Sequence, residues 1–306
     1  MKKKEDINLN TSFCGVGLQN PTVLASGILG TTPDLLKRVA RAGAGAVTTK
    51  SIGQTSRNGN ENPSVLAWDS GLINAVGLPN PGVADFMKKF HDFSPTVPAI
   101  VSIFGSSERE VQEVAKKIDK LPFSMIELNI SCPNKADGML FGQDPDSARK
   151  LVSVVKSVTK KPVIPKLTPN VTDIVEVAVA CQKGGADGLC AINTVSGMII
   201  NAEAKRPVLS YRKGGLSGPA IRPIAIRCVY DICSAVKIPV IGTGGISSGR
   251  DAVEMLMAGA TLVGIGTAAY YRGINVFSKV TAEMRAWMSS HQYRDVKELV
   301  GCANEE

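Results

Sequence analysis

The 306-residue sequence lacks the long apolar runs that mark membrane and secreted proteins. No stretch reaches the roughly 18 uncharged apolar residues that a membrane-spanning helix needs. The Lys-rich start, 1–4, is followed by Glu5, Asp6 and Asn8, where a secretory signal would need apolar residues. We therefore expect neither a membrane anchor nor a secretion signal, and predict a cytoplasmic protein.

The sequence also lacks the basic patterns of nucleic-acid-binding proteins. Its formal charge is +8, but part of that charge belongs to the Lys-rich start. Later segments contain neither a long Lys/Arg run nor basic residues interleaved with aromatic ones. We therefore predict no nucleic-acid partner. The 44% hydrophobic content suffices for a full globular core.

Metal-ligating residues are scarce and badly spaced. The two histidines are His91 and His291, and no two cysteines form a Cys-x-x-Cys pair, so we expect no zinc or iron–sulfur site on this chain. An odd cysteine count without a secretion signal favours reduced thiols. Six cysteines are interpreted as small buried hydrophobes, whereas Cys132 stands apart; the seven are Cys14, Cys132, Cys181, Cys190, Cys228, Cys233 and Cys302.

Short β-branched runs alternate with helical patterns along the chain, and there are eight such pairs. The predicted strands are 22–26, 46–51, 99–104, 124–131, 163–167, 188–194, 240–243 and 262–267. The predicted helices include 34–42, 108–120, 145–160, 173–183, 219–236 and 249–258. This alternation predicts an α/β fold, a single (β/α)8 TIM barrel. No Pro/Gly-rich linker divides the chain, so we expect one domain over 1–306.

Local signals mark the ends of several predicted helices. Asp144 and Ser248 are suited to cap helix N-termini, and Gly43, Gly185 and Gly259 are suited to a left-handed residue after a helix. Two segments, 52–80 and 195–216, are longer than a barrel loop needs. Long loops that follow barrel strands lie at the catalytic face, so we expect these two to build a lid or pocket.

Polar side chains end four of the predicted strands. Because inward and outward positions alternate along a barrel strand, outward-facing Val47, Leu128 and Ile192 would direct their polar neighbours to the barrel mouth. Those neighbours are Lys50, Asn129, Lys166 and Asn193. A buried lysine without a partner is costly, so the sequence predicts a bound anion or a polar cofactor.

Glycine-rich segments end the last two predicted strands. They read Gly-Thr-Gly-Gly over 242–245 and Gly-Ile-Gly-Thr over 264–267. In TIM barrels the loops at this position commonly bind phosphate through backbone N–H groups. The first strand is not followed by the glycine pattern of a dinucleotide fold, so we expect no dinucleotide to bind this chain.

Cys132 follows the polar end of the fourth strand in the segment Asn-Ile-Ser-Cys-Pro-Asn, 129–134. Pro133 would break the strand and place the thiol in a loop above the predicted pocket. A free thiol titrates near ~8.5, so it could act as a base with help from neighbouring cations such as Lys50 and Lys166.

At these residues the sequence resembles the dihydroorotate dehydrogenases, flavin enzymes of pyrimidine synthesis, over nearly its whole length. The matching segments are 24–27, 49–51, 74–80, 127–134, 166–172, 192–194, 214–218 and the two glycine-rich loops. Cysteine at 132 is typical of the soluble class of this family. The membrane-bound, quinone-using class has serine there and an additional N-terminal helix.

The resemblance implies FMN in the barrel mouth. Its phosphate would lie on Gly244, Gly245, Gly266 and Thr267, and the rest of its site would include Ser26, Lys50, Ser51, Ser102, Asn129, Lys166, Ile192 and Gly218. The family often has asparagine where this chain has Ser102, with the bulky Phe104 nearby, so the flavin contact at 102 differs from the family pattern.

The resemblance also implies the substrate site and the roles of two residues. Dihydroorotate would be held by Lys50, Asn74, Ala75, Val76, Gly77, Leu78, Asn129, Asn193 and Thr194. Cys132 would take a proton from C5 of dihydroorotate while a hydride leaves C6 for the flavin. Lys166 would stabilise the negative charge of the reduced flavin.

Within the soluble class, 129–134, 166–172 and 214–218 are most similar to the NAD-linked, B-type branch. That similarity implies a second chain that carries FAD and a [2Fe–2S] cluster, in a heterotetramer of two catalytic and two electron-transfer chains. The fumarate-linked, A-type branch is the alternative. A dihydropyrimidine dehydrogenase is a third possibility, although Lys50 suits a substrate carboxylate that uracil lacks.

Two readings outside this chemistry explain less of the sequence. A lyase that uses Lys166 as a Schiff base would leave Cys132 and the amides without a role. A barrel retained as a binding or scaffold subunit would predict a lost base or a disrupted phosphate loop, and the sequence shows neither.

Overall fold

The computed structural model describes residues 7–131 and 141–304, and eight parallel strands form its central sheet. In sheet order they are β3 (Thr22–Leu24), β16 (Leu262–Ile265), β15 (Val240–Thr243), β10 (Leu189–Ala191), β9 (Val163–Leu167), β8 (Met125–Asn129), β7 (Ala99–Ile103) and β4 (Val47–Thr48). A parallel bridge between Val23 and Ala46 joins the two edge strands. The sheet therefore closes, which confirms the predicted (β/α)8 barrel.

Helices follow the strands and cover the outside of the barrel. They are α1 (Pro33–Arg41), α2 (Val83–Phe90), α3 (Glu108–Ile118), α4 (Pro145–Lys156), α5 (Ile174–Lys183), α6 (Arg222–Ala235), α7 (Gly249–Met257), α8 (Ala268–Arg272) and α9 (Val276–Ser290), with 3-10 turns η1 (Phe141–Gln143), η2 (Pro219–Ile221) and η3 (Val296–Leu299). None of the helices in the described ranges is long and apolar enough to cross a membrane.

The predicted helix ends are confirmed. The Asp144 side chain accepts from the backbone N–H of Ser147, and Ser248 forms a reciprocal capping box with Asp251. Gly43, Gly185 and Gly259 all have positive φ, as a left-handed residue after a helix requires.

The inside of the barrel is apolar at its N-terminal end. Its inner cluster takes one side chain from each of seven strands and one from Ala46, which directly precedes β4; the members are Val23, Ala46, Ile100, Met125, Ile164, Cys190, Ile241 and Leu262. A hairpin of β1 (Thr11–Phe13) and β2 (Val16–Leu18) inserts Phe13 and Leu18 into the same cluster. Fully burying a phenylalanine of this kind stabilises the fold by roughly 1.5–3 kcal/mol. The hairpin therefore closes this end of the barrel. Val47 and Leu128, which were predicted to face outward, belong to the core between the strands and the helices.

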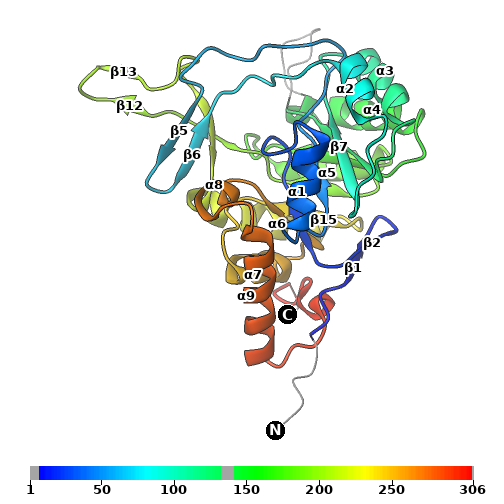
Figure 1. The fold of residues 1–306 in the computed structure, drawn as a ribbon, viewed down its shortest axis with the longest axis vertical. Coiled ribbons are helices and arrows are strands. Elements are labelled where there is room, and N and C mark those ends of the chain that lie inside the picture. Colours follow the sequence, from blue (N-terminus) through cyan, green and yellow to red (C-terminus); the bar gives the residue numbers. More distant parts are fainter. Residues whose placement is uncertain (1–6, 132–140, 305–306) are drawn as a thin grey trace.

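The two long segments form a second sheet that the sequence analysis did not predict. Its antiparallel strands, in sheet order, are β11 (Val195–Gly197), β14 (Gly214–Ser217), β6 (Gly71–Asn74) and β5 (Val65–Trp68), and β12 (Ile200–Asn201) pairs with β13 (Arg206–Pro207) in a separate hairpin. Figure 1 shows β5, β6 and the β12–β13 hairpin projecting from one side of the barrel. Because Asn74 pairs with Gly215, the sheet joins the loops that follow β4 and β10.

Candidate active site

A cavity of about 570 Å3 opens at the C-terminal ends of the barrel strands, with residues of the second sheet in its wall. Its size is ordinary for a small-molecule site. The predicted site residues that line it are Ser26, Lys50, Ser51, Asn74, Val76, Leu78, Asn129, Lys166, Ile192, Asn193, Thr194, Gly218, Gly244, Gly245, Gly266 and Thr267. The structure therefore brings together residues predicted from nine separate parts of the sequence.

Three predicted residues do not line the cavity, and a fourth lies outside the described residues. Ala75 and Gly77 belong to the 74–78 segment but do not line the cavity. That segment is held by Asn60, whose Nδ2 donates to the carbonyl of Ala75 at 2.8 Å. Ser102 is fully buried behind the wall, and Cys132 lies outside the described residues.

Phe104, the other unusual residue near Ser102, is buried as well. The guanidinium of Arg57 lies 5.0 Å from the centre of its ring. Since neither Ser102 nor Phe104 lines the cavity, the departure from the family pattern changes what supports the wall.

Other lining residues were not predicted as site residues. They are Ala25, Gly27, Ile28, Val65, Leu72, Ser131, Ser217, Ile221, Thr243, Ile246, Gly264, Ala268 and Tyr270. Ser131, Thr243 and Gly264 lie inside motifs that the sequence analysis had already singled out. Val65, Leu72 and Tyr270 carried no such signal, because only the second sheet and α8 bring them to the cavity.

Two lysines meet in the cavity, and neither has an acidic partner among the described residues. The Nζ of Lys166, which is only 6% exposed, donates to Ser26 Oγ at 3.0 Å. Burial and the charge of Lys166 together lower the pKa of Lys50 from its ordinary value of 10.5. A site with two such cations favours an anionic ligand.

The two predicted amides are linked through Ser131. The backbone N–H of Ser131 donates to Asn129 Oδ1 at 3.2 Å, and its hydroxyl accepts from Asn193 Nδ2 at 2.9 Å. The Oδ1 of Asn193 accepts from the backbone N–H of Thr194 at 2.8 Å. Because a backbone N–H can only donate, it fixes which end of each amide is oxygen.

Cys190 holds its thiol 3.6 Å from Oγ1 of the cavity-lining Thr243, and this thiol is not suited to act as a base. Burial raises the pKa of its thiol to about 12, with Lys166 acting to lower it and Glu127 to raise it. Cys190 therefore remains protonated near neutral pH, when it cannot accept a proton.

The glycine-rich end of the cavity fits a phosphate group. Gly244 and Gly245 have φ values of 140° and 77°, and a Cβ on Gly245 would lie 2.5 Å from the Cβ of Arg222. Among the described residues, no group accepts the backbone N–H of Gly245 or of Thr267. Free backbone donors beside glycine are the donor set that binds phosphate. With the lysines and amides at the other end, these residues fit FMN.

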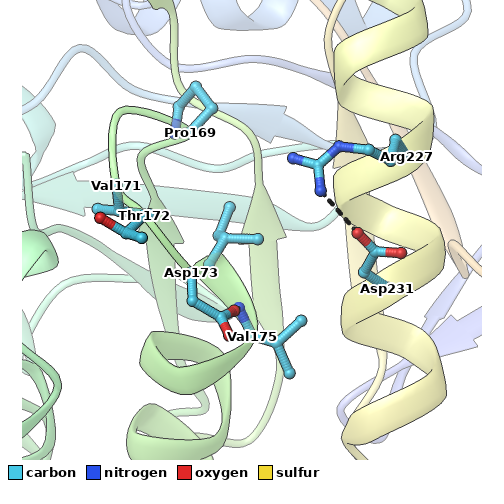
Figure 2. A pocket seen from close by; sticks show the side chains of 8 residues that line it. Pro169, Val171, Thr172, Asp173, Val175, Arg227 and Asp231 are labelled. Carbon is cyan, nitrogen blue, oxygen red and sulfur yellow. Dashed lines mark hydrogen bonds and ion pairs between the residues drawn. The ribbon is translucent and has the colours of Figure 1, made fainter.

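A second, smaller hollow of about 310 Å3 lies outside the barrel, between α6 and the loop before α5 (Figure 2). Its charged residues are already engaged: Arg227 pairs with Asp231 at 2.8 Å, and Asp173 caps α5. This hollow therefore lacks the unpartnered groups that distinguish the barrel mouth.

The closed barrel, the glycine-rich phosphate end and the paired lysines define a (β/α)8-barrel enzyme for an anionic substrate and a phosphate-bearing cofactor. Residues 8–288 match the family model of dihydroorotate dehydrogenase. The chain belongs to the dihydroorotate dehydrogenase family.

Two relatives show how much of the chain this similarity covers. The chain is 48% identical over 296 residues to the "Dihydroorotate dehydrogenase B (NAD(+)), catalytic subunit" of Pyrococcus abyssi, and the alignment covers 96% of this chain and 99% of that protein. It is 47% identical over 303 residues to the protein of the same name in Methanocaldococcus jannaschii, covering 97% and 98%. The predicted family resemblance is therefore confirmed.

Proposed function

We propose that this chain oxidises dihydroorotate to orotate in pyrimidine synthesis, as the catalytic chain of an NAD-linked enzyme. The observation that carries this proposal is the meeting of Lys50 and Lys166 with Asn129 and Asn193 in one cavity. A carboxylate on the substrate would pair with Lys50, which has no acidic partner within the described ranges, and the fixed amides suit the polar edge of a pyrimidine ring. The names of the relatives support the same activity.

FMN is the cofactor of this proposal, and when bound it accepts the hydride from the substrate. Its phosphate would be held at Gly244, Gly245, Gly266 and Thr267, and its ring system near Ser26, Ser51, Lys166, Ile192 and Gly218. The Lys166 ammonium, held by Ser26, would balance negative charge on the flavin ring system. We also propose that 1–306 form one FMN-binding domain, because β3 near the start pairs with β16 near the end.

Substrate binding and proton removal fall to residues at the other side of the cavity. Lys50 would bind the carboxylate, and Asn74, Val76, Leu78 and Thr194 would surround the ring. Ala75 and Gly77 would set the course of their segment. Cys132, which lies outside the described residues, would take the proton from C5, and this role rests on the sequence alone.

A partner chain completes the proposed reaction. The relatives are named catalytic subunits, and we propose that the partner carries FAD and a [2Fe–2S] cluster and passes electrons to NAD⁺. Two catalytic and two electron-transfer chains would form a heterotetramer. We place it in the cytoplasm, where the six described cysteines would stay free as they are in the structure.

An absorption spectrum followed by turnover tests the proposed function. The purified chain should show flavin bands near about 375 and 450 nm. It should then reduce an artificial dye with dihydroorotate but not with dihydrouracil, which has no carboxylate for Lys50. A flavin-free protein, or equal turnover of the two substrates, would contradict the proposal.

A further inference from the structure

A buried carboxylate lies behind the cavity wall, and neither the sequence analysis nor the proposed function uses it. Glu127 is 4% exposed and comes from β8, two residues before Asn129. The Cys190 thiol lies within interaction distance of its carboxyl group, and among the described residues Glu127 forms no ion pair. A buried carboxylate needs a strong hydrogen-bond donor, and Ser102 supplies one: its hydroxyl donates to Glu127 Oε1 at 2.8 Å.

The bond to Glu127 sets the direction of the next one. A serine hydroxyl has a single hydrogen, and that of Ser102 is given to the carboxylate. The Oγ atoms of Ser51 and Ser102 are 2.9 Å apart, so Ser51 must be the donor in this pair. The Ser51 oxygen is then left to accept, and Asn129 Nδ2 donates to it over 3.4 Å. Every donor in the series therefore points toward Glu127.

The orientation of Asn129 is fixed from its other side as well. The backbone N–H of Ser131 donates to Asn129 Oδ1, which excludes the flipped amide. One amide hydrogen goes to Ser51, and among the described residues no acceptor takes the other. Because Asn129 lines the cavity, this second N–H is available to a ligand.

We propose that Glu127 is a positioning residue that holds Asn129 as a hydrogen-bond donor toward the ligand, through Ser102 and Ser51. A carboxylate suits this role because it can only accept, so the series cannot reverse. A glutamine at 127 could donate to Ser102, and the Ser102 hydroxyl could then donate to Ser51. The Ser51 hydroxyl would in turn point its hydrogen at Asn129, whose Nδ2 is also a donor, so the two donors would oppose each other. Ser102, which differs from the asparagine common in the family, is the link that transmits the direction.

This inference rests on the proposed function, since it takes orotate as the ligand whose acceptor atoms meet Asn129. The test is a titration of FMN-loaded protein with orotate, followed by the flavin absorbance, which gives Kd without turnover. Glu127→Gln preserves the size of the side chain and should raise the orotate Kd about tenfold, the loss of about one good hydrogen bond. Ser102→Ala breaks the series in the middle and should raise Kd similarly.

Thr49→Val is the matched control. The Thr49 side chain is fully buried in the same part of the barrel, and its Oγ1 accepts from the backbone N–H of Ser102 at 3.0 Å, outside the side-chain series. This variant loses a buried hydrogen bond and should lower Tm, yet its orotate Kd should stay within about twofold of wild type. A purely structural role for Glu127 would make Glu127→Gln behave like this control.

A double variant shows whether Glu127 and Ser102 act on Asn129 through one hydrogen-bonded series or act on orotate binding independently. If Glu127 acts only through Ser102, Glu127→Gln combined with Ser102→Ala should raise Kd no more than the worse single variant. A loss equal to the product of the two single losses overturns the proposal, as does an unchanged Kd in Glu127→Gln. Should Glu127→Gln fail to fold, an unchanged Kd in Ser102→Ala overturns it alone. Wild-type protein that binds no orotate contradicts the proposed function itself.

Discussion

Lys166 Nζ donates to Ser26 Oγ at 3.0 Å, across the mouth of the barrel. Lys166 is the second-last residue of β9 and Ser26 follows β3, and three other strands separate β9 from β3 along one side of the sheet. The bond therefore holds an ammonium group at the mouth, where neither strand alone could fix it. Its charge is available to a bound anion, because no carboxylate among the described residues pairs with it.

Replacing Lys166 by alanine should impair the flavin more than the fold. The apolar inner cluster does not include Lys166, so we expect Tm to change by only a few degrees. Loss of the charge that balances the reduced cofactor should slow flavin reduction about 100-fold or more, or release FMN. Stopped-flow absorbance and flavin content measure both effects. Normal flavin content together with a wild-type reduction rate would refute this role.

Replacing Lys50 by methionine should stabilise the substrate-free protein while it destroys substrate binding. The fold lowers the pKa of Lys50 below 10.5, its ordinary value. Between the lowered pKa and 10.5, the unfolded chain binds more protons than the folded chain. The contribution of Lys50 to the stability of the fold therefore rises with pH. Lys50→Met should therefore raise Tm by about 2–4 °C near neutral pH and by less as the pH approaches 10. Its orotate Kd should rise at least about 30-fold. A variant less stable than wild type at neutral pH would contradict the account.

Replacing Cys132 by serine tests the proposed base. The variant should retain FMN but lose at least about 100-fold of dihydroorotate oxidation near neutral pH, because a hydroxyl is a far weaker base than a thiol. The residual rate should rise steeply with pH. A pH–rate profile measures both features, and wild-type activity at pH 7 would show that Cys132 is not the base.

Replacing Gly245 by alanine tests the phosphate end of the cavity. The new Cβ would lie 2.5 Å from Arg222 Cβ in a backbone with φ of 77°, so the loop must shift and FMN should be lost on gel filtration. Gly185→Ala is the matched control, because Gly185 also has positive φ (94°) but its nearest neighbour to a Cβ is Lys156 Cγ at 3.7 Å. The control should lose stability and retain FMN. Equal flavin loss in both variants would remove the phosphate role from this loop.

The barrel could be predicted from sequence because its strands and helices carry local signals. All eight strands lie where the β-branched runs stand, with ends that differ by no more than three residues. The second sheet could not be predicted, since its central strands β6 and β14 are short, contain glycine and lie far apart in sequence, and they pair with each other only in the folded chain. Their stability comes from long-range contact, which periodicity does not report.

The sequence predicts the site residues that end barrel strands and line the cavity. It does not predict the buried residues that hold those side chains in place. Lys50, Asn129, Lys166 and Asn193 followed from alternation along barrel strands. Ser102 also points inward by that alternation. It does not reach the cavity, because the Ser51 side chain lies between Ser102 and the cavity. Glu127 carried no signal as a site residue, because its partner Ser102 lies on another strand, 25 positions away.

Dihydroorotate-dependent NAD⁺ reduction, measured with and without a partner, tests the central proposal most directly. The purified chain should bleach its own flavin with dihydroorotate and pass electrons to a dye, yet reduce NAD⁺ poorly or not at all. Co-expression with an iron–sulfur flavoprotein partner should restore NAD⁺ reduction, and the complex should contain both FMN and FAD. Efficient turnover with fumarate by the isolated chain would contradict the NAD-linked assignment, and a flavin that dihydroorotate leaves oxidised would contradict the activity itself.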